Sequence, residues 1–378
     1  MTSAITESSV RDALARVEDP EIGRPITELD MVKSIAIDGN NVAVEVYLTI
    51  AGCPMKNTIE ANTRAVLEEL DGVGTVTVTL DAMNDEQRRA LRTKLRGGQA
   101  EPEIPFAKPE STTRVIAVAS GKGGVGKSSM TANLAAALAT KGLKVGVVDA
   151  DIYGHSIPGL LGNTEPPTVL EEDMLLPPQA HGIKFISIGQ FVEGNAPIVW
   201  RGPMLHRAIQ QFLGDVFWGD LDVLLLDLPP GTGDVALSIA QLIPNAELVV
   251  VTTPQAAASE VAERAGSIAQ QTRQRVAGVI ENMGAMVLSD GSTLDVFGSG
   301  GGEVVAERLS TILGHPVPLL GQIPLDPTLR ANGDAGTPVV IAAPESAAAQ
   351  AIQTVADKLV VRSDSLAGKP LGLGVTRH

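Results

Sequence analysis

The sequence predicts an α/β protein with a mostly parallel, doubly wound sheet and a small additional α+β domain at its N-terminus. The apolar runs at 221–229 and 247–254 are typical of strands that are buried on both faces of a parallel sheet. Strand and helix patterns alternate through 114–362, which favours a sheet covered by helices on both sides. A length of 378 residues favours two domains over one.

Residues 1–95 are predicted to form the small α+β domain. Apolar residues at helical spacing predict its first helix, and the sequence Asp-Gly-Asn-Asn at 38–41 predicts a hairpin turn. The expected elements are helices at 8–17, 55–69 and 85–95 and strands at 31–38, 41–50 and 73–80.

Residues 96–113 contain glycines and three prolines, which predicts a semi-extended linker. The second domain is expected to span 114–362, and the Gly-rich residues 363–378 are expected to form a flexible tail. Its expected strands are 115–120, 144–149, 184–188, 223–227, 248–252, 276–281 and 319–323.

The composition limits the possible partners and compartment. A net charge of −15 argues against non-specific binding to nucleic acid or to an anionic membrane. The single cysteine, Cys53, cannot form a disulfide within the chain, which favours a reducing compartment. The polar N-terminus lacks a signal-peptide pattern, and no apolar run reaches the roughly 20 residues of a membrane-spanning helix. A cytoplasmic protein is expected.

The sequence GKGGVGKS at 121–128 is the strongest functional signal, because it matches the phosphate-loop pattern between a predicted strand and a predicted helix. Glycines let successive backbone N–H groups face phosphate oxygens, and the helix N-terminus adds positive charge. Lys127 is predicted to reach the β and γ phosphates, and the Ser128 hydroxyl to bind Mg²⁺. The candidate nucleotide-binding residues are Gly121, Lys122, Gly123, Gly124, Val125, Gly126, Lys127, Ser128 and Ser129.

Lys122 is a second lysine in this loop, and the general pattern does not require it. It is either a solvated surface lysine or a charge donated across a homodimer interface to the nucleotide of the partner. In the second case it would stabilise negative charge during phosphoryl transfer, as an arginine finger does.

Acidic residues follow two predicted strands, at the sheet edge where parallel sheets bind ligands. We expect Asp151 to orient the attacking water and Asp149 to support Mg²⁺ through its water shell; the alternative is a turn or helix-cap pair. Asp227 is expected to contact Mg²⁺ indirectly. Pro230 and Gly231 follow it as a candidate switch, with the Gly231 N–H near the γ phosphate, unless the Pro-Pro-Gly sequence is a simple turn.

Asn282 follows the predicted strand at 276–281. Its amide has both a donor and an acceptor with which to bind the adenine edge of ATP. A turn-forming asparagine is an equally good interpretation of the pattern alone.

Several longer motifs resemble one family. GKGGVGKS, the pair of acids and DLPPGTGD (227–234) are similar to deviant phosphate-loop ATPases, which include septum-site and plasmid-partition ATPases. DADIYGHSIPGLLG (149–162), GVIENM (278–283) and IPLDPTLRANGDAGTPVV (323–340) resemble the Mrp/ApbC family of iron–sulfur cluster carriers. DPEIGRPITELDMV (19–32) and LTIAGCPM (48–55) resemble the iron–sulfur assembly domain that often precedes this ATPase.

This resemblance implies a homodimeric ATPase that binds a labile iron–sulfur cluster and passes it to apo iron–sulfur proteins. It also implies a trans-acting role for Lys122, a water-orienting role for Asp151 and an adenine contact for Asn282. The alternative is a nucleotide-switched regulatory or scaffold ATPase without a cluster; a partition or septum-placement ATPase disagrees with the acidic charge.

The sequence departs from the family at one important place. Many members have a Cys-x-x-Cys pair shortly after the Asn-Met dipeptide, and here Leu288 and Gly291 stand about where the two thiolates are expected. Neither residue can bind iron. Cys53 is therefore the remaining candidate ligand, although a free cysteine is also commonly a small buried hydrophobic residue.

Overall fold

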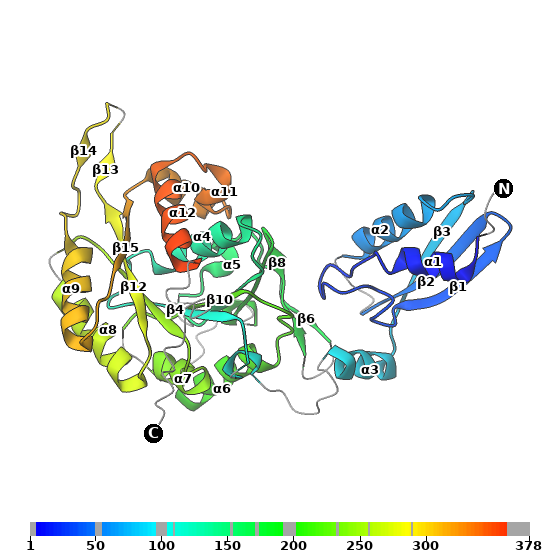
Figure 1. Cartoon of the computed structure of the whole chain (residues 1–378), viewed down its shortest axis with the longest axis horizontal. Helices are drawn as coiled ribbons and strands as arrows, with labels where there is room; N and C mark the ends of the chain where they lie inside the picture. Colours follow the sequence, from blue (N-terminus) through cyan, green and yellow to red (C-terminus); the bar gives the residue numbers. More distant parts are fainter. Residues whose placement is uncertain are drawn as a thin grey trace, which may run out of the picture.

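The chain folds into a small N-terminal domain and a larger domain built around an extended sheet (Figure 1). The computed structural model describes residues 5–49, 55–95, 104–108, 110–151, 154–170, 174–191, 202–231, 234–255, 258–288 and 290–360. Cys53, the residues 96–103 of the expected linker and the expected tail lie outside these ranges.

The N-terminal domain is a three-stranded sheet packed against helices. Its sheet has the order β1-β2-β3, in which β1 and β2 form an antiparallel hairpin and β3 lies parallel to β2. A parallel neighbour requires a crossover connection, and α2 provides it. The elements are α1 (Glu7–Leu14), β1 (Val32–Asp38), β2 (Asn41–Leu48), α2 (Lys56–Glu68), β3 (Val76–Ala82) and α3 (Asp85–Leu95).

The N-terminal domain contacts the larger domain at a short two-stranded sheet, β6 (Thr168–Val169) and β7 (Leu175–Leu176). The buried side chains of Leu170, Met174, Leu176 and Phe217 belong to the same hydrophobic cluster as the core of the N-terminal domain. Two polar contacts accompany them: Thr168 Oγ1 donates to Glu21 Oε1 at 3.1 Å, and Gln179 Nε2 donates to the Pro20 carbonyl at 2.8 Å.

The larger domain contains an eight-stranded sheet of order β15-β12-β11-β4-β10-β5-β9-β8. All neighbouring strands are parallel except β8, which pairs antiparallel at the edge. The strands are β4 (Arg114–Ser120), β5 (Val145–Asp149), β8 (Gln179–Ala180), β9 (Ile183–Ser187), β10 (Val223–Asp227), β11 (Glu247–Thr252), β12 (Val276–Gly284) and β15 (Leu319–Pro324).

Helices cover both faces of this sheet, so the predicted doubly wound fold is confirmed (Figure 1). One face packs against α4 (Lys127–Thr140), α5 (Ile157–Leu160), α11 (Val339–Ala342) and α12 (Ala347–Val360). The other packs against α6 (Gly202–Gly214), α7 (Asp234–Leu242), α8 (Ala258–Thr272) and α9 (Gly301–Leu313). The helix α10 (Pro327–Asp334) follows β15.

The fold brings the predicted site residues to one edge of the sheet. The chain runs from β4 through α4 to β5 on one side, and later from β10 to β11 on the other side of β4. The strand order therefore reverses near β4, and the crevice at the carboxyl ends of the strands at such a point is the usual ligand site of an α/β sheet.

The structure adds features that the sequence analysis did not predict. The two-residue strands β6, β7, β13 (Met286–Val287) and β14 (Thr293–Leu294) were not expected, and neither was the edge strand β8. The end of the expected linker contains a 3-10 helix, Pro105–Ala107, whose Phe106 is buried against Trp218 in the core of the larger domain. None of the helices in the described part of the chain combines the length and apolar content that a bilayer crossing requires.

Candidate nucleotide site

The phosphate loop connects β4 to α4, as the motif requires. Gly124 and Gly126 both have positive φ, at 76° and 78°, a conformation that favours glycine. Gly126 is also restricted by space, because a Cβ atom there would overlap Asn282 Nδ2. The loop therefore needs glycine at 126 for two independent reasons.

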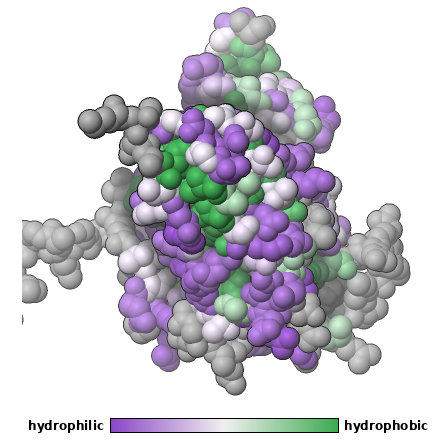
Figure 2. Space-filling view, turned by 90° about the vertical axis from the view of Figure 1, so that its right-hand side faces the viewer, coloured by the Kyte–Doolittle hydropathy of each residue, from purple (hydrophilic) through white to green (hydrophobic). Residues whose placement is uncertain are grey.

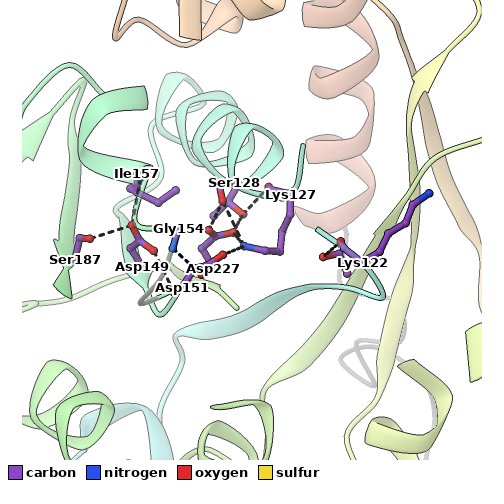
Figure 3. Close-up of polar contacts among 11 residues, drawn as sticks. Lys122, Lys127, Ser128, Asp149, Asp151, Gly154, Ile157, Ser187 and Asp227 are labelled. Atoms are coloured by element: carbon purple, nitrogen blue, oxygen red, sulfur yellow. Dashed lines mark hydrogen bonds and ion pairs between the residues drawn. The ribbon is translucent and has the colours of Figure 1, made fainter. Parts of the chain in front are cut away.

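Lys127 and Ser128 converge on Asp227 at the centre of the site (Figure 3). Lys127 Nζ lies 2.8 Å from Asp227 Oδ1, and Ser128 Oγ donates to Asp227 Oδ2 at 2.5 Å. Thr131 Oγ1, one turn further along α4, donates to Asp227 Oδ1 at 2.8 Å. The buried Asp227 thus holds the first turn of α4 to the end of β10.

Asp149 is fully buried and accepts hydrogen bonds with both of its oxygens. Oδ1 accepts from the Asp151 N–H, and Oδ2 accepts from the Ile157 N–H and from Ser187 Oγ at 3.0 Å. Burial, together with the nearby charge of Asp227, raises the pKa of Asp149 to about 7. The structure therefore places this predicted magnesium-supporting acid inside the protein, where it joins β5 to β9 and α5.

Asp151 lies on the side of the site next to Lys127. Its Oδ2 is 3.8 Å from Lys127 Nζ, and its Oδ1 accepts from the Gly154 N–H at 3.1 Å. The side chain is 11% exposed, so it borders the crevice more openly than Asp149 and Asp227 do. This position is compatible with the predicted role in orienting water.

Lys122 points away from the carboxylates, as Figure 3 shows. No carboxylate of the described residues forms an ion pair with its Nζ, which instead donates to Gln255 Oε1 at 2.6 Å. The lysine therefore does not act on the nucleotide site of its own subunit in this conformation.

The candidate switch residues contact the phosphate loop directly. Pro230 lies next to Gly123, and the Gly231 N–H donates to the Ser120 carbonyl at 2.9 Å. The expectation that the Gly231 N–H faces a γ phosphate stays a prediction. Gly231 has φ of 93° with open space around it, so backbone conformation rather than crowding favours glycine there.

Asn282 is buried, and its Nδ2 donates to the Val125 carbonyl of the phosphate loop at 2.9 Å. This contact uses one N–H of the amide, which leaves the other N–H and the oxygen to offer to a ligand. Asn282 lines a pocket of about 260 Å³ together with Gly126, Ser129, Pro324 and Asp326. The pocket continues from the phosphate loop, which suits a nucleotide base.

The region of the absent cysteine pair forms the β13–β14 hairpin, which projects from the domain in Figure 1. Leu288 and Gly291 both lie in its turn, where the Gly291 N–H donates to the Leu288 carbonyl. Val287, Leu288, Leu294 and Val296 are between 39% and 53% exposed, and the top of Figure 2 shows hydrophobic surface on this projection. The described residues contain no group of three or more His, Cys, Asp or Glu side chains that could hold a metal ion.

Three contributors to the site were missed in the sequence analysis. Thr131 is one helical turn after Lys127, and this spacing could have suggested that it shares a partner with the loop. Ser187 is the last residue of β9 and Gln255 follows β11, but neither belongs to a motif with a known chemical role.

Family comparisons agree with this geometry. A family model described as the NUBPL iron-transfer P-loop NTPase matches residues 111–360. The chain belongs to this NTPase family. A second family model, described as an iron–sulfur cluster assembly protein, matches residues 7–78 of this chain, which lie in its N-terminal domain.

Relatives match the NTPase over almost its whole length. An iron–sulfur cluster carrier protein from Mycobacterium tuberculosis (strain ATCC 25618 / H37Rv) is 63% identical over 373 residues, covering 98% of this chain and 97% of the relative. A protein of the same name from Deinococcus radiodurans is 44% identical, covering 92% and 93%. A solved nucleotide-binding protein from Archaeoglobus fulgidus, in complex with ADP, is 35% identical with a TM-score of 0.51, covering 67% of this chain and 91% of that chain.

Proposed function

We propose that this NTPase is an ATP-hydrolysing iron–sulfur cluster carrier that works as a cytoplasmic homodimer and passes clusters to apo iron–sulfur proteins. The observation that carries the proposal is the convergence of Lys127 and Ser128 on Asp227 beside the base-sized pocket at Asn282. The names of the relatives support a carrier rather than a regulatory ATPase.

ATP suits this site by charge and by shape. Lys127 would exchange its contact with Asp227 for the β and γ phosphates, and the loop N–H groups from 121 to 129 would face the phosphate oxygens. The Asn282 oxygen would accept from the amino group of adenine, and guanine has a carbonyl oxygen in place of that group.

The oxygen donors also fit Mg²⁺, which prefers oxygen ligands and usually keeps several waters. The Ser128 hydroxyl would bind the ion, and Asp227 and Asp149 would act on its waters. When bound, Mg²⁺ neutralises charge that develops on the transferred phosphate.

The remaining residues of the site would position the reacting groups. Asp151, which borders the crevice, would orient the attacking water. Lys122 of one subunit would reach the phosphates of the other, because its amine already points out of its own site. Loss of the γ phosphate would let Gly231 return to the Ser120 carbonyl and would open the dimer.

The cluster is the cargo, and its ligands differ from those of many family members. Cys53 would supply one thiolate per subunit, since the β13–β14 hairpin has none. Two subunits then provide two thiolates, and the other ligands would come from glutathione-like thiols, histidine, carboxylates or the recipient protein.

Anaerobic reconstitution tests the carrier function. We expect iron and acid-labile sulfide in the wild-type protein and loss of both in Cys53→Ser, with ATP hydrolysis retained. Transfer to an apo ferredoxin, followed by its visible absorption, measures delivery. A wild-type protein that hydrolyses ATP but holds no iron or sulfide would exclude the carrier function.

A further inference from the structure

Lys122 and Gln255 form a contact that the reaction outlined above does not use. Lys122 Nζ donates to Gln255 Oε1 at 2.6 Å, although the two residues are 133 positions apart in the sequence. Gln255 follows β11, which is the neighbour of β4 in the sheet, and β4 leads into the phosphate loop. The fold therefore places the amide beside the lysine through two adjacent strands.

The backbone around Lys122 is anchored on several sides. Ser120 Oγ donates to the Lys122 carbonyl at 3.0 Å, and Arg264 Nη1 donates to the Gly121 carbonyl at 2.9 Å. A Cβ atom at Gly121 would also overlap Val261 of α8. Because the main chain is held in this way, movement of the lysine amine is left to its flexible side chain.

The chemistry of the partner decides how firmly the amine is held. Lys127, in the same loop, pairs with the buried carboxylate of Asp227. Lys122 contacts a neutral amide at the surface, and a hydrogen bond with one charged partner is weaker than one in which both partners are charged. A neutral acceptor therefore holds the Lys122 side chain in one rotamer and still allows the amine to be released.

We propose that Gln255 is a positioning residue, which holds Lys122 withdrawn in the separate subunit and releases it when two subunits close. This inference rests on the proposed function, in which Lys122 reaches the nucleotide of the partner. Gln255 would thereby raise the free energy that hydrolysis requires, because Lys122 has to leave the Gln255 amide before it can cross the interface.

Two substitutions at Gln255 give opposite expectations. Gln255→Glu replaces the amide by a carboxylate of the same size, and the ion pair should hold Lys122 more firmly. We expect turnover at saturating ATP to fall by up to about fivefold, the equilibrium effect of an exposed ion pair, and to recover at high salt. Gln255→Met keeps the length of the side chain but has no comparable acceptor, so half-maximal turnover should be reached at a lower protein concentration.

A measurement of nucleotide affinity distinguishes a positioning role of Gln255 from structural damage to the phosphate loop. Both variants should bind a fluorescent ATP analogue with wild-type affinity, because Lys127 and the loop amides are unchanged. A purely structural role of Gln255 predicts instead that both variants lose turnover in the same direction without recovery in salt, and this result would overturn the inference.

The same two variants in a Lys122→Ala background complete the test as a double-mutant cycle. If Gln255 acts through Lys122, both substitutions should have no further effect there. Persistent effects in that background would reject the positioning role. If Lys122→Ala itself keeps wild-type turnover, the proposed cross-dimer reaction fails, and this outcome is distinct from a failure at Gln255 alone.

Discussion

Asp149 makes the stability of the larger domain depend on pH in a direction that can be measured. Its carboxyl group is fully buried, and its pKa is raised to about 7 by burial and by the charge of Asp227. The unfolded chain loses this proton near the ordinary value of 3.8. Between these two values the folded protein retains a proton that the unfolded chain has released. The free energy of unfolding should therefore fall as the pH rises through this window.

The size of the effect follows from the shift. A difference of about 3 units, at 1.36 kcal/mol each, corresponds to about 4 kcal/mol between pH 4 and pH 8. This is a large fraction of the roughly 5–15 kcal/mol by which most domains are stable. Asp149→Asn replaces the acid by a neutral side chain of the same size. We expect the variant to lose this slope, although it loses some stability at every pH because its amide nitrogen cannot accept the hydrogen bonds that Asp149 accepts.

Urea unfolding of the full chain, followed by tryptophan fluorescence, measures this slope in the larger domain, because both tryptophans are in its sequence and Trp218 is buried. Ser187→Ala is the matched control. The hydrogen bond from the Ser187 hydroxyl lowers the pKa of Asp149. Removal of this hydroxyl should therefore raise that pKa and extend to higher pH the range over which the free energy of unfolding falls. Parallel curves for the wild type and Asp149→Asn between pH 5 and pH 8 would refute the reasoning.

Three other substitutions test separate parts of the structure. Lys127→Ala should abolish binding of a fluorescent ATP analogue, and retained binding would remove the phosphate loop from the site. Phe106→Ala should destabilise the larger domain by about 3–5 kcal/mol in urea, because its ring packs in the core against Trp218; a loss below about 1 kcal/mol would show that the segment is not anchored. Burial lowers the pKa of Lys184 to about 8, so its charge costs stability below that pH. Lys184→Met should therefore stabilise the protein at pH 7 and lose this advantage towards pH 10, and an advantage that grew with pH would contradict the burial argument.

Long, strongly patterned elements could be predicted from the sequence. The strand at 223–227 coincides with β10, because a short continuous apolar run is typical of a buried parallel strand, and the helix at 85–95 coincides with α3. The meeting of Asp149, Asp151 and Asp227 was also predictable, because parallel strands bring their carboxyl ends to one edge of the sheet.

Other features could not be predicted, for physical reasons. The strands β13 and β14 have two residues each, which is too short for an alternating pattern to appear. Phe106 lies among prolines that resemble a linker, and its burial depends on Trp218, more than 100 positions away. The donor of Asn282 is used by the Val125 carbonyl, and a sequence pattern cannot say which of several partners an amide chooses.

The different partners of the two loop lysines imply an order of events in the proposed reaction. Lys127 is buried and pairs with carboxylates, so its release requires a ligand with comparable negative charge, and the triphosphate of ATP provides it. Lys122 is held by a neutral amide at the surface, and the phosphates of a second subunit are sufficient to attract it. ATP binding in one subunit would therefore precede the movement of Lys122 of the other subunit, because only a bound nucleotide creates the negative charge towards which that lysine moves. Hydrolysis would then require a second subunit, and this requirement would protect the nucleotide from wasteful cleavage in a single one.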